Sequence, residues 1–300
     1  MNASASTTDL APPRSRTLAV AAALFAVYVI WGSTYLGIRI GLEGYPPFLM
    51  GGLRMLFPGV LMYLVLRWRG MAAPTRAQWR TLWVLSIWMV LLSNGLVNYA
   101  EQDVSSGLAA IAVASMPLWA ALFSVLRGEH PSRGEWLGLG IGFLGVLWLN
   151  AGGELSATPR GMIALLIAPV AWAWGSIWSR GLDLPSPFMS AAGQMLCGSI
   201  WMFATGLLTG ERIVEMPELR PTLAVAYLAV FGSIVAFTAY VWLLKNVRPA
   251  LATSYAYVNP PLAVLFGVWL MDEKFGANDL AAMGVILIGV VIVMRSRSRR

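Results

Sequence analysis

The stretch that decides the fold is residues 18–38, which read LAVAAALFAVYVIWGSTYLGI. It holds no charged residue and is long enough to cross a hydrocarbon core about 30 Å thick as a helix. A backbone inside lipid must satisfy its own hydrogen bonds, so the stretch has to be helical. Similar runs recur along the whole chain, which indicates an all-α protein that crosses a membrane several times.

The composition supports this class. The chain is 58% hydrophobic and 12% charged, whereas a soluble domain carries about 25% charged residues. The net charge of +7 does not indicate nucleic acid, because the basic residues lie between apolar runs and at the C-terminus. That placement is typical of contacts with anionic lipid headgroups. The single cysteine, Cys197, excludes a disulfide within the chain.

We expect ten membrane spans. They cover residues 18–38, 47–66, 80–99, 106–126, 134–150, 161–180, 187–208, 221–243, 250–270 and 278–294. The first span is too long for a signal-peptide core and is followed by others, so we expect it to be retained. Residues 1–17 are expected to form a disordered cytoplasmic tail and residues 295–300 a basic cytoplasmic tail.

The basic residues orient these spans. With both termini inside, the outer segments contain only Arg39, Arg160, Arg212, Arg220 and Lys274, and the other basic loop residues are inside. The positive-inside rule therefore predicts a multi-pass protein of the inner (plasma) membrane with cytoplasmic N- and C-termini.

An internal repeat divides the chain. Trp31-Gly32-Ser33 recurs as Trp174-Gly175-Ser176, and further matches follow at an offset near 140–144. The halves are residues 18–150 and 151–294, with five spans each. Because five is odd, the second half must be inverted relative to the first. Inverted repeats are typical of secondary carriers that bind substrate between the halves, although a repeat can also be a relic of duplication.

These residues resemble the EamA branch of the drug/metabolite transporter superfamily. The resemblance rests on Trp31-Gly32-Ser33-Thr34-Tyr35, on a proline followed by an acid in spans four and nine, and on glycine-rich fifth and tenth spans. It covers nearly the whole chain after the tail. It implies ten helices and the export of amino acids and other metabolites, as in the bacterial aromatic amino-acid exporters.

Polar side chains within spans are candidates for the substrate site, because they are costly in lipid. Asn94 and Asn98 lie four residues apart on one helical face, and they either contact substrate or join helices. Arg54 is the only charge well inside a span. It could hold a substrate carboxylate, extend to the outer surface, or form a gate with Glu43 or Glu101.

Aromatic residues would form much of the cavity wall. Trp31 and Trp174 correspond in the repeat, so a cavity between the halves would be lined by both; helix packing is the alternative. Such a wall suits an amphipathic ligand and offers a cation–π surface. The remaining candidates are Tyr35, Tyr99, Trp178, Tyr240, Tyr257 and Asn259.

Paired helix breaks are expected in the two halves. Pro117 and Pro260 remove backbone hydrogen bonds in spans four and nine. Gly32 and Gly175 permit bending or close approach in spans one and six. Such pairs indicate hinges or the binding region of a carrier.

The sequence therefore predicts an alternating-access carrier that exports small metabolites, with amino acids as the favoured substrate. A multidrug or nucleoside efflux carrier, or an importer of the same fold, is the alternative. No acid or histidine lies deep in a span, so we expect uncoupled transport. No P-loop or catalytic motif is present, so we expect neither an enzyme nor a cofactor. The expected partners are a small-molecule substrate and membrane lipid, with the chain a monomer or a weak homodimer.

Overall fold

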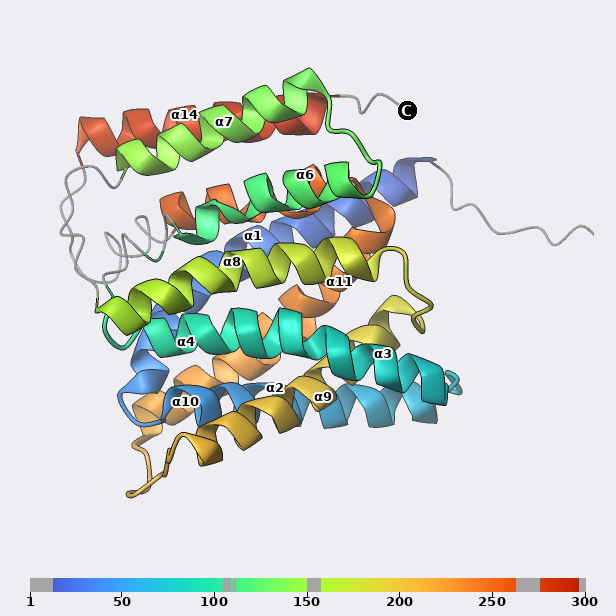
Figure 1. The fold of residues 1–300 in the computed structure, drawn as a ribbon, viewed down its shortest axis with the longest axis vertical. Helices are drawn as coiled ribbons and strands as arrows, with labels where there is room; N and C mark the ends of the chain where they lie inside the picture. The colour runs from blue at the N-terminus through green and yellow to red at the C-terminus, as the bar shows by residue number, and fades with distance from the viewer. Residues whose placement is uncertain (1–12, 105–108, 110–111, 150–157, 263–275, 297–300) are drawn as a thin grey trace, which may run out of the picture.

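The computed structural model describes residues 13–104, 109, 112–149, 158–262 and 276–296, which are helical and contain no strand (Figure 1). The first half comprises α1 (Pro13–Leu42), α2 (Pro47–Trp68), α3 (Arg76–Ser86), the π-helix η1 (Ile87–Gly95), α4 (Leu96–Ala100), α6 (Met116–Leu126) and α7 (Arg133–Leu149). The second comprises α8 (Pro159–Ser179), α9 (Pro187–Leu208), α10 (Leu219–Tyr227), the π-helix η2 (Leu228–Phe237), α11 (Thr238–Asn246), α12 (Pro249–Ala252) and α14 (Ala277–Arg295). A short helical segment at 255–262 follows α12.

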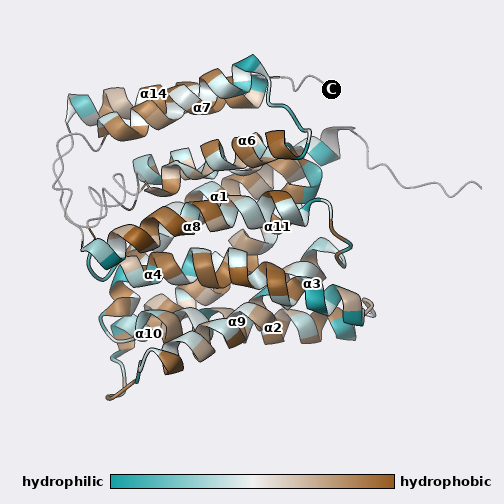
Figure 2. Ribbon diagram, viewed as in Figure 1, coloured by the Kyte–Doolittle hydropathy of each residue, from teal (hydrophilic) through white to brown (hydrophobic). Residues whose placement is uncertain are grey.

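Several helices are built to span a membrane. In the part of the chain that the structure describes, six are long and apolar enough: Arg16–Leu42, Pro47–Trp68, Arg76–Ala100, Pro159–Ser179, Pro187–Leu208 and Leu219–Asn246. Hydrophobic residues follow the middle of the bundle, and hydrophilic residues gather at its two ends (Figure 2). Large apolar side chains point outward, among them Phe57 and Leu207. Such an apolar surface requires lipid around it.

The helices lie roughly alongside one another in layers (Figure 1). α7 and α14 pack together at one edge, and α2 packs on α9 at the other. Between these edges, α1 contacts η2, α10 and α11, while α8 contacts η1, α4 and α6. The central elements around α1 and α8 are therefore the ones that can enclose a site.

Local sequence signals start the helices. Proline stands in the first turn of α2, α8, α9 and α12, where its missing N–H has no partner to lose. Thr75 forms a capping box with Gln78 at the start of α3. The Glu211 carboxylate accepts hydrogen bonds from the N–H groups of Phe48 and Leu49, so a distant loop caps α2.

We call the end of the bundle that carries Pro13 and Arg295 the terminal end. Here Arg127, Arg180 and Arg248 donate to main-chain carbonyls at the C-terminal ends of α8, α11 and α14. Arg248 also pairs with the buried Glu135. These arginines satisfy carbonyls that have no partner within their own helix.

Some boundaries differ from the prediction. α1 begins at Pro13, so the helix takes up residues expected in the tail, while residues 1–12 and 297–300 lie outside the described part. The expected span 250–270 is divided after Ala252, and its residues 263–270 also lie outside that part. Neither π-helix was expected, because apolar spacing does not distinguish an i→i+5 turn from an α-turn.

Candidate functional site

A small cavity of about 80 Å³ lies among the central helices. It is enclosed by α1, α2, η1, α4, the residues around the start of α6, α8 and the 255–262 segment. The lining residues are Trp31, Thr34, Tyr35, Ile38, Arg54, Ser93, Asn94, Val97, Val113, Met116, Ala168, Pro169, Trp172, Tyr255 and Asn259. We call this space the central cavity. It is mostly apolar, with a few polar groups, as is usual for a small-molecule site.

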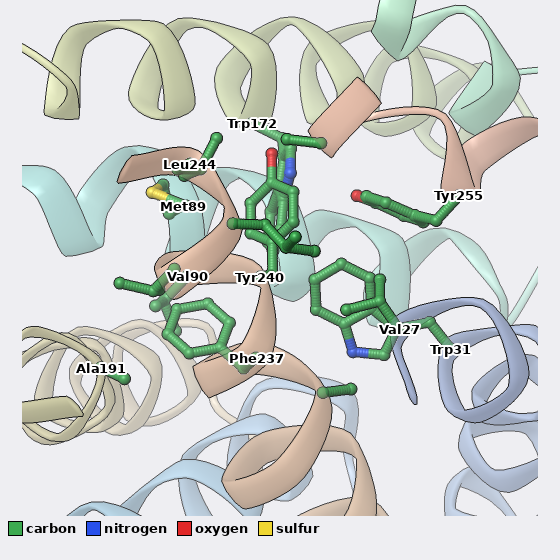
Figure 3. Close-up of a cluster of buried hydrophobic side chains, with 14 of the residues drawn as sticks. Val27, Trp31, Met89, Val90, Trp172, Ala191, Phe237, Tyr240, Leu244 and Tyr255 are labelled. Atoms are coloured by element: carbon green, nitrogen blue, oxygen red, sulfur yellow. The ribbon is translucent and has the colours of Figure 1, made fainter. Parts of the chain in front are cut away.

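Four rings, Trp31, Trp172, Tyr240 and Tyr255, form an aromatic cluster at one side of the cavity (Figure 3). The Trp31 centroid lies 5.3 Å from Trp172, 5.2 Å from Tyr240 and 4.6 Å from Tyr255. These edge-to-face and tilted arrangements are favourable for aromatic quadrupoles. The indole Nε1 of Trp31 donates to the Gly232 carbonyl at 3.1 Å, which fixes the ring in place.

The order of residues along the helices places this cluster. On α1 the lining runs from Trp31 to Ile38, toward the helix end farther from Pro13. Tyr240 lies behind the cavity on α11, which runs toward the terminal end. The aromatic cluster therefore separates the central cavity from the terminal end.

Arg54 is the only charged residue among the described residues that line the cavity. Its side chain is 3% exposed, and its Nε and Nη1 atoms are buried without hydrogen-bond partners. The ion pairs within 4.0 Å among the described residues do not include it. Its main-chain carbonyl accepts a bond from Ser233 Oγ at 3.1 Å, which ties α2 to η2 at this point.

Amide side chains supply the other polar groups. Asn94 donates its Nδ2 to the Met89 carbonyl at 2.9 Å, five residues back in η1. Ser233 makes the corresponding bond to the Leu228 carbonyl in η2. Polar side chains thus bond to carbonyls within both π-turns. Asn259, at 2% exposure, lines the cavity with its Oδ1 unpartnered.

Five of the predicted site residues line the central cavity: Trp31, Tyr35, Arg54, Asn94 and Asn259. The others are near it or elsewhere. Tyr240 stands behind the cavity in the aromatic cluster, bonded to Ser176 Oγ at 2.7 Å. Glu101 follows α4; its Oε1 is buried without a partner, and it interacts electrostatically with Arg54.

Asn98, Tyr99 and Tyr257 are used in packing. Asn98 donates to the Pro47 carbonyl at 3.3 Å, with its Oδ1 left unpartnered. Tyr99 stacks on Phe48 and borders a second cavity described below. The Tyr257 hydroxyl donates to the Leu139 carbonyl at 3.0 Å, in a separate cluster beside α7 and α14.

Trp172, Tyr255 and Met116 are cavity residues that sequence reasoning missed. The predicted Trp174 instead packs on Phe123 of α6 with centroids 5.3 Å apart, and Trp178 lies partly buried against the core. Residues two apart on a helix point to nearly opposite sides. The signal that could have identified Trp172 is its spacing of four from Ala168, on a face shared with Pro169.

The predicted breaks at Gly32 and Gly175 are not present, because α1 and α8 run through them without interruption. Of the two roles expected for these glycines, bending and close approach, the structure shows close approach. A Cβ on Gly32 would meet Leu262 Cβ at 2.8 Å, and one on Gly175 would meet Met89 Cγ at 2.6 Å. Pro117 stands in the first turn of α6, and Pro260 lies within the 255–262 segment.

A wider cavity of about 970 Å³, which we call the vestibule, lies at the end opposite the terminal end. Its lining includes Glu43, Tyr99, Arg160, Glu211 and Arg212. The vestibule is therefore polar and charged, unlike the central cavity. Among the described residues, no group of three or more His, Cys, Asp or Glu side chains could hold a metal ion.

Comparison with known proteins adds independent information. The EamA-like transporter family matches residues 18–151 and again residues 159–295. The chain is 44% identical over 272 residues to "Uncharacterized inner membrane transporter YedA" of Escherichia coli K12, covering 90% of this chain and 89% of that protein. It is 25% identical to "Uncharacterized transporter YdfC" of Bacillus subtilis, covering 93% and 91%. One solved crystal structure aligns with a TM-score of 0.77 at 22% identity, covering 93% and 97%, which shows a shared fold.

Proposed function

Because this chain belongs to the EamA-like transporter family and is a membrane transporter, we propose that it is an alternating-access carrier. We propose that it exports small metabolites, with amino acids as the favoured substrates, through the central cavity. The observation that carries this proposal is the cavity itself. It is enclosed by elements of both halves, and it combines an aromatic wall with buried polar atoms, on Arg54 and Asn259, that have no hydrogen-bond partner among the described residues.

The proposed architecture is ten transmembrane helices in two inverted five-helix repeats, residues 18–150 and 151–294. Two features support it. The family matches the chain twice, once in each half. The helix contacts are also paired: α1 packs on η2 as α8 packs on η1, and each π-helix stands in the third long helix of its half. In inverted-repeat carriers the substrate binds between the halves.

The proposed orientation places the terminal end in the cytoplasm and the vestibule outside. The orientation is supported by the basic residues of the terminal end, such as Arg127, Arg180 and Arg248. The name of the Escherichia coli relative, an inner membrane transporter, supports the inner membrane as the location. The aromatic cluster would then lie between the central cavity and the cytoplasm.

The proposed substrate contacts are Trp31, Tyr35, Asn94, Asn259 and Arg54, with Glu101 as a gate residue beside Arg54. The structure adds Trp172 to this set. An ammonium or an aromatic ring could lie against the aromatic cluster, since ring faces attract cations and stack on other rings.

Transport by the purified protein tests the proposal. Proteoliposomes should exchange labelled amino acids in the absence of any ion gradient, against a panel that includes nucleosides and cationic dyes. Trp172→Phe should reduce exchange by roughly 3- to 10-fold, because one ring contact is weakened. Trp174→Phe is the matched control, two residues away on the same helix and outside the cavity.

Equal exchange rates for both variants would contradict the proposal that the central cavity is the transport site. Exchange of dyes or nucleosides but not of amino acids would contradict amino acids as the substrate class and indicate the exchanged class in their place. A strict need for a proton gradient would exclude uncoupled transport.

A further inference from the structure

The guanidinium of Arg54 is the least satisfied group of the central cavity. It is 97% buried, and two of its nitrogens have no acceptor. Burying a cation without a hydrogen-bonded counter-charge is far more costly than burying a neutral amide. The opposite half of the molecule avoids that cost, because the repeat counterpart of Arg54 is Gln194, which is likewise buried. The charge is therefore not a requirement of the fold.

The electrostatic surroundings of Arg54 include a carboxylate with a buried oxygen, that of Glu101. Glu101 interacts with it electrostatically but does not approach within the 4.0 Å of an ion pair, and it does not line the cavity. On the other side, Nη2 faces Gly232, where even a Cβ would stand 3.5 Å away. Arg54 thus borders the cavity with a buried guanidinium that has no ion pair within 4.0 Å among the described residues.

We propose that Arg54 forms a carboxylate subsite, so that a carboxylate is the obligatory group of the substrate and an amino group is dispensable. This inference rests on the proposed transport through the central cavity. A guanidinium meets a carboxylate through two parallel N–H···O bonds when Nη2 donates together with Nε or with Nη1, and two of these three nitrogens, Nε and Nη1, have no partner in the described part of the structure. One guanidinium neutralises one charge, so the site fits a monocarboxylate rather than a phosphate dianion, which would require further cations.

The rest of the cavity defines the other end of the ligand. Trp31, Trp172 and Tyr255 present ring surfaces, and Ile38, Val97 and Val113 are apolar. The site therefore fits small monocarboxylic acids with an apolar or aromatic body. Amino acids are one subset of this class. Acids that lack the amino group belong to it as well.

A series of four compounds separates the two polar groups of the ligand. Phenylalanine carries both, 3-phenylpropanoate only the carboxylate, phenethylamine only the ammonium, and phenylalaninamide has its carboxylate neutralised. Binding to the full-length protein in detergent is followed by the fluorescence of its tryptophans, two of which line the cavity. We expect phenylalanine and 3-phenylpropanoate to bind at least about tenfold more tightly than the amine and the amide, as a charge-assisted pair provides.

Variants then assign the effect to Arg54. Arg54→Gln introduces the residue that the fold already accommodates in the other half. It should weaken the binding of both carboxylates by roughly 10- to 100-fold without changing the binding of phenethylamine. Arg54→Lys keeps the charge but not the paired donors, so its affinity for the carboxylates should lie between those of the wild type and Arg54→Gln. Arg212→Gln, in the vestibule, is the control and should bind like the wild type.

Equal affinity of the wild type for phenylalanine and phenylalaninamide would overturn the subsite without any variant. Absence of binding of every one of the four compounds would overturn it as well. Unchanged carboxylate binding by Arg54→Gln would also overturn it. Proteoliposome exchange distinguishes this failure from that of the proposed function. Amino-acid exchange that is unaffected by Arg54→Gln rejects the subsite alone, whereas Arg54-dependent binding without amino-acid exchange rejects the amino-acid function alone.

Discussion

At the scale of single residues, the sequence indicated which residue types line the cavity better than it indicated which face of each helix turns inward. Arg54, Asn259, Trp31, Tyr35 and Asn94 were predicted because charge, amide and aromatic groups are unusual inside a span, and all five line the central cavity. What could not be predicted was which face of each helix turns inward. The repeat drew attention to Trp174, but the packing of α8 on η1 and α6 brings Trp172 into the cavity instead.

The roles of the asparagines also depended on unseen geometry. Asn94 bonds through its side chain to the Met89 carbonyl, five residues back within the π-helix η1. Nothing in the apolar spacing of the sequence indicates such a turn. Asn98 has the same residue type and the same helical face, yet it bonds to the Pro47 carbonyl on α2.

Glu135 offers a test of residue-level stability. It is 2% exposed and pairs with Arg248, so Glu135→Gln leaves that guanidinium without its counter-charge. Because Arg248 retains some exposure, we expect a loss of about 1–3 kcal/mol, below the usual cost for a fully buried pair. Thermal unfolding in detergent can be followed by a thiol-reactive dye, since the single cysteine, Cys197, is buried until the protein unfolds.

The control for this prediction is Asp103→Asn. Asp103 pairs with Arg160, whose side chain is 64% exposed, and such surface pairs contribute about 0–1 kcal/mol. If both variants unfold at the same temperature, the Glu135–Arg248 pair is not stabilising.

At the scale of elements, span positions were largely predictable and internal breaks were not. Apolar runs and flanking prolines placed the long helices within a few residues, because length and hydropathy are direct requirements of the bilayer. Each long third helix, however, is α, then π, then α, and the expected ninth span is divided after Ala252. These features depend on tertiary contacts, such as Trp31 Nε1 bonding to the Gly232 carbonyl.

The contact between α7 and α14 provides a prediction at this scale. A Cβ on Gly138 would lie 2.7 Å from the Gly289 carbonyl oxygen and 2.9 Å from the Val293 nitrogen, both main-chain atoms. Gly138→Ala must therefore push the two helices apart, at a cost of about 1–3 kcal/mol. The measurement is again the unfolding temperature reported by Cys197.

Gly140, two residues further along α7 and on nearly the opposite side of the helix, is the matched control. Nothing lies within 4 Å of its Cβ position, so Gly140→Ala should be neutral or slightly stabilising. A similar loss in both variants would mean that the glycines act through helix propensity and not through close packing.

At the scale of the whole molecule, the sequence predicted a two-part plan that no single helix reveals. The matches at a near-constant offset led to the prediction of an inverted repeat, which stays a prediction; the structure shows paired contacts of α1 with η2 and of α8 with η1. The enclosed cavity and its closure by the aromatic cluster could not be predicted, since they arise from residues distant in sequence.

Labelling from one side of the membrane tests this plan. In a Cys197→Ala background, His130→Cys lies in the loop between α6 and α7, and Glu273→Cys corresponds to it in the second half, outside the described residues. Inversion predicts that an impermeant thiol reagent added to intact cells labels Glu273→Cys but not His130→Cys. Val214→Cys, in the exposed loop between α9 and α10, serves as the outer-face control. Labelling of both or neither test position would exclude the inverted plan.

The arginines of the terminal end have a consequence for how such a protein is inserted. Arg127, Arg180 and Arg248 each hold the last carbonyls of a helix other than their own. In the proposed orientation, the arginines that direct each segment to the cytoplasmic side are thus the same ones that bind neighbouring segments together. Experiments that relocate these charges to invert the membrane orientation would also remove the hydrogen bonds between helices. Misorientation and unfolding would therefore have to be measured separately.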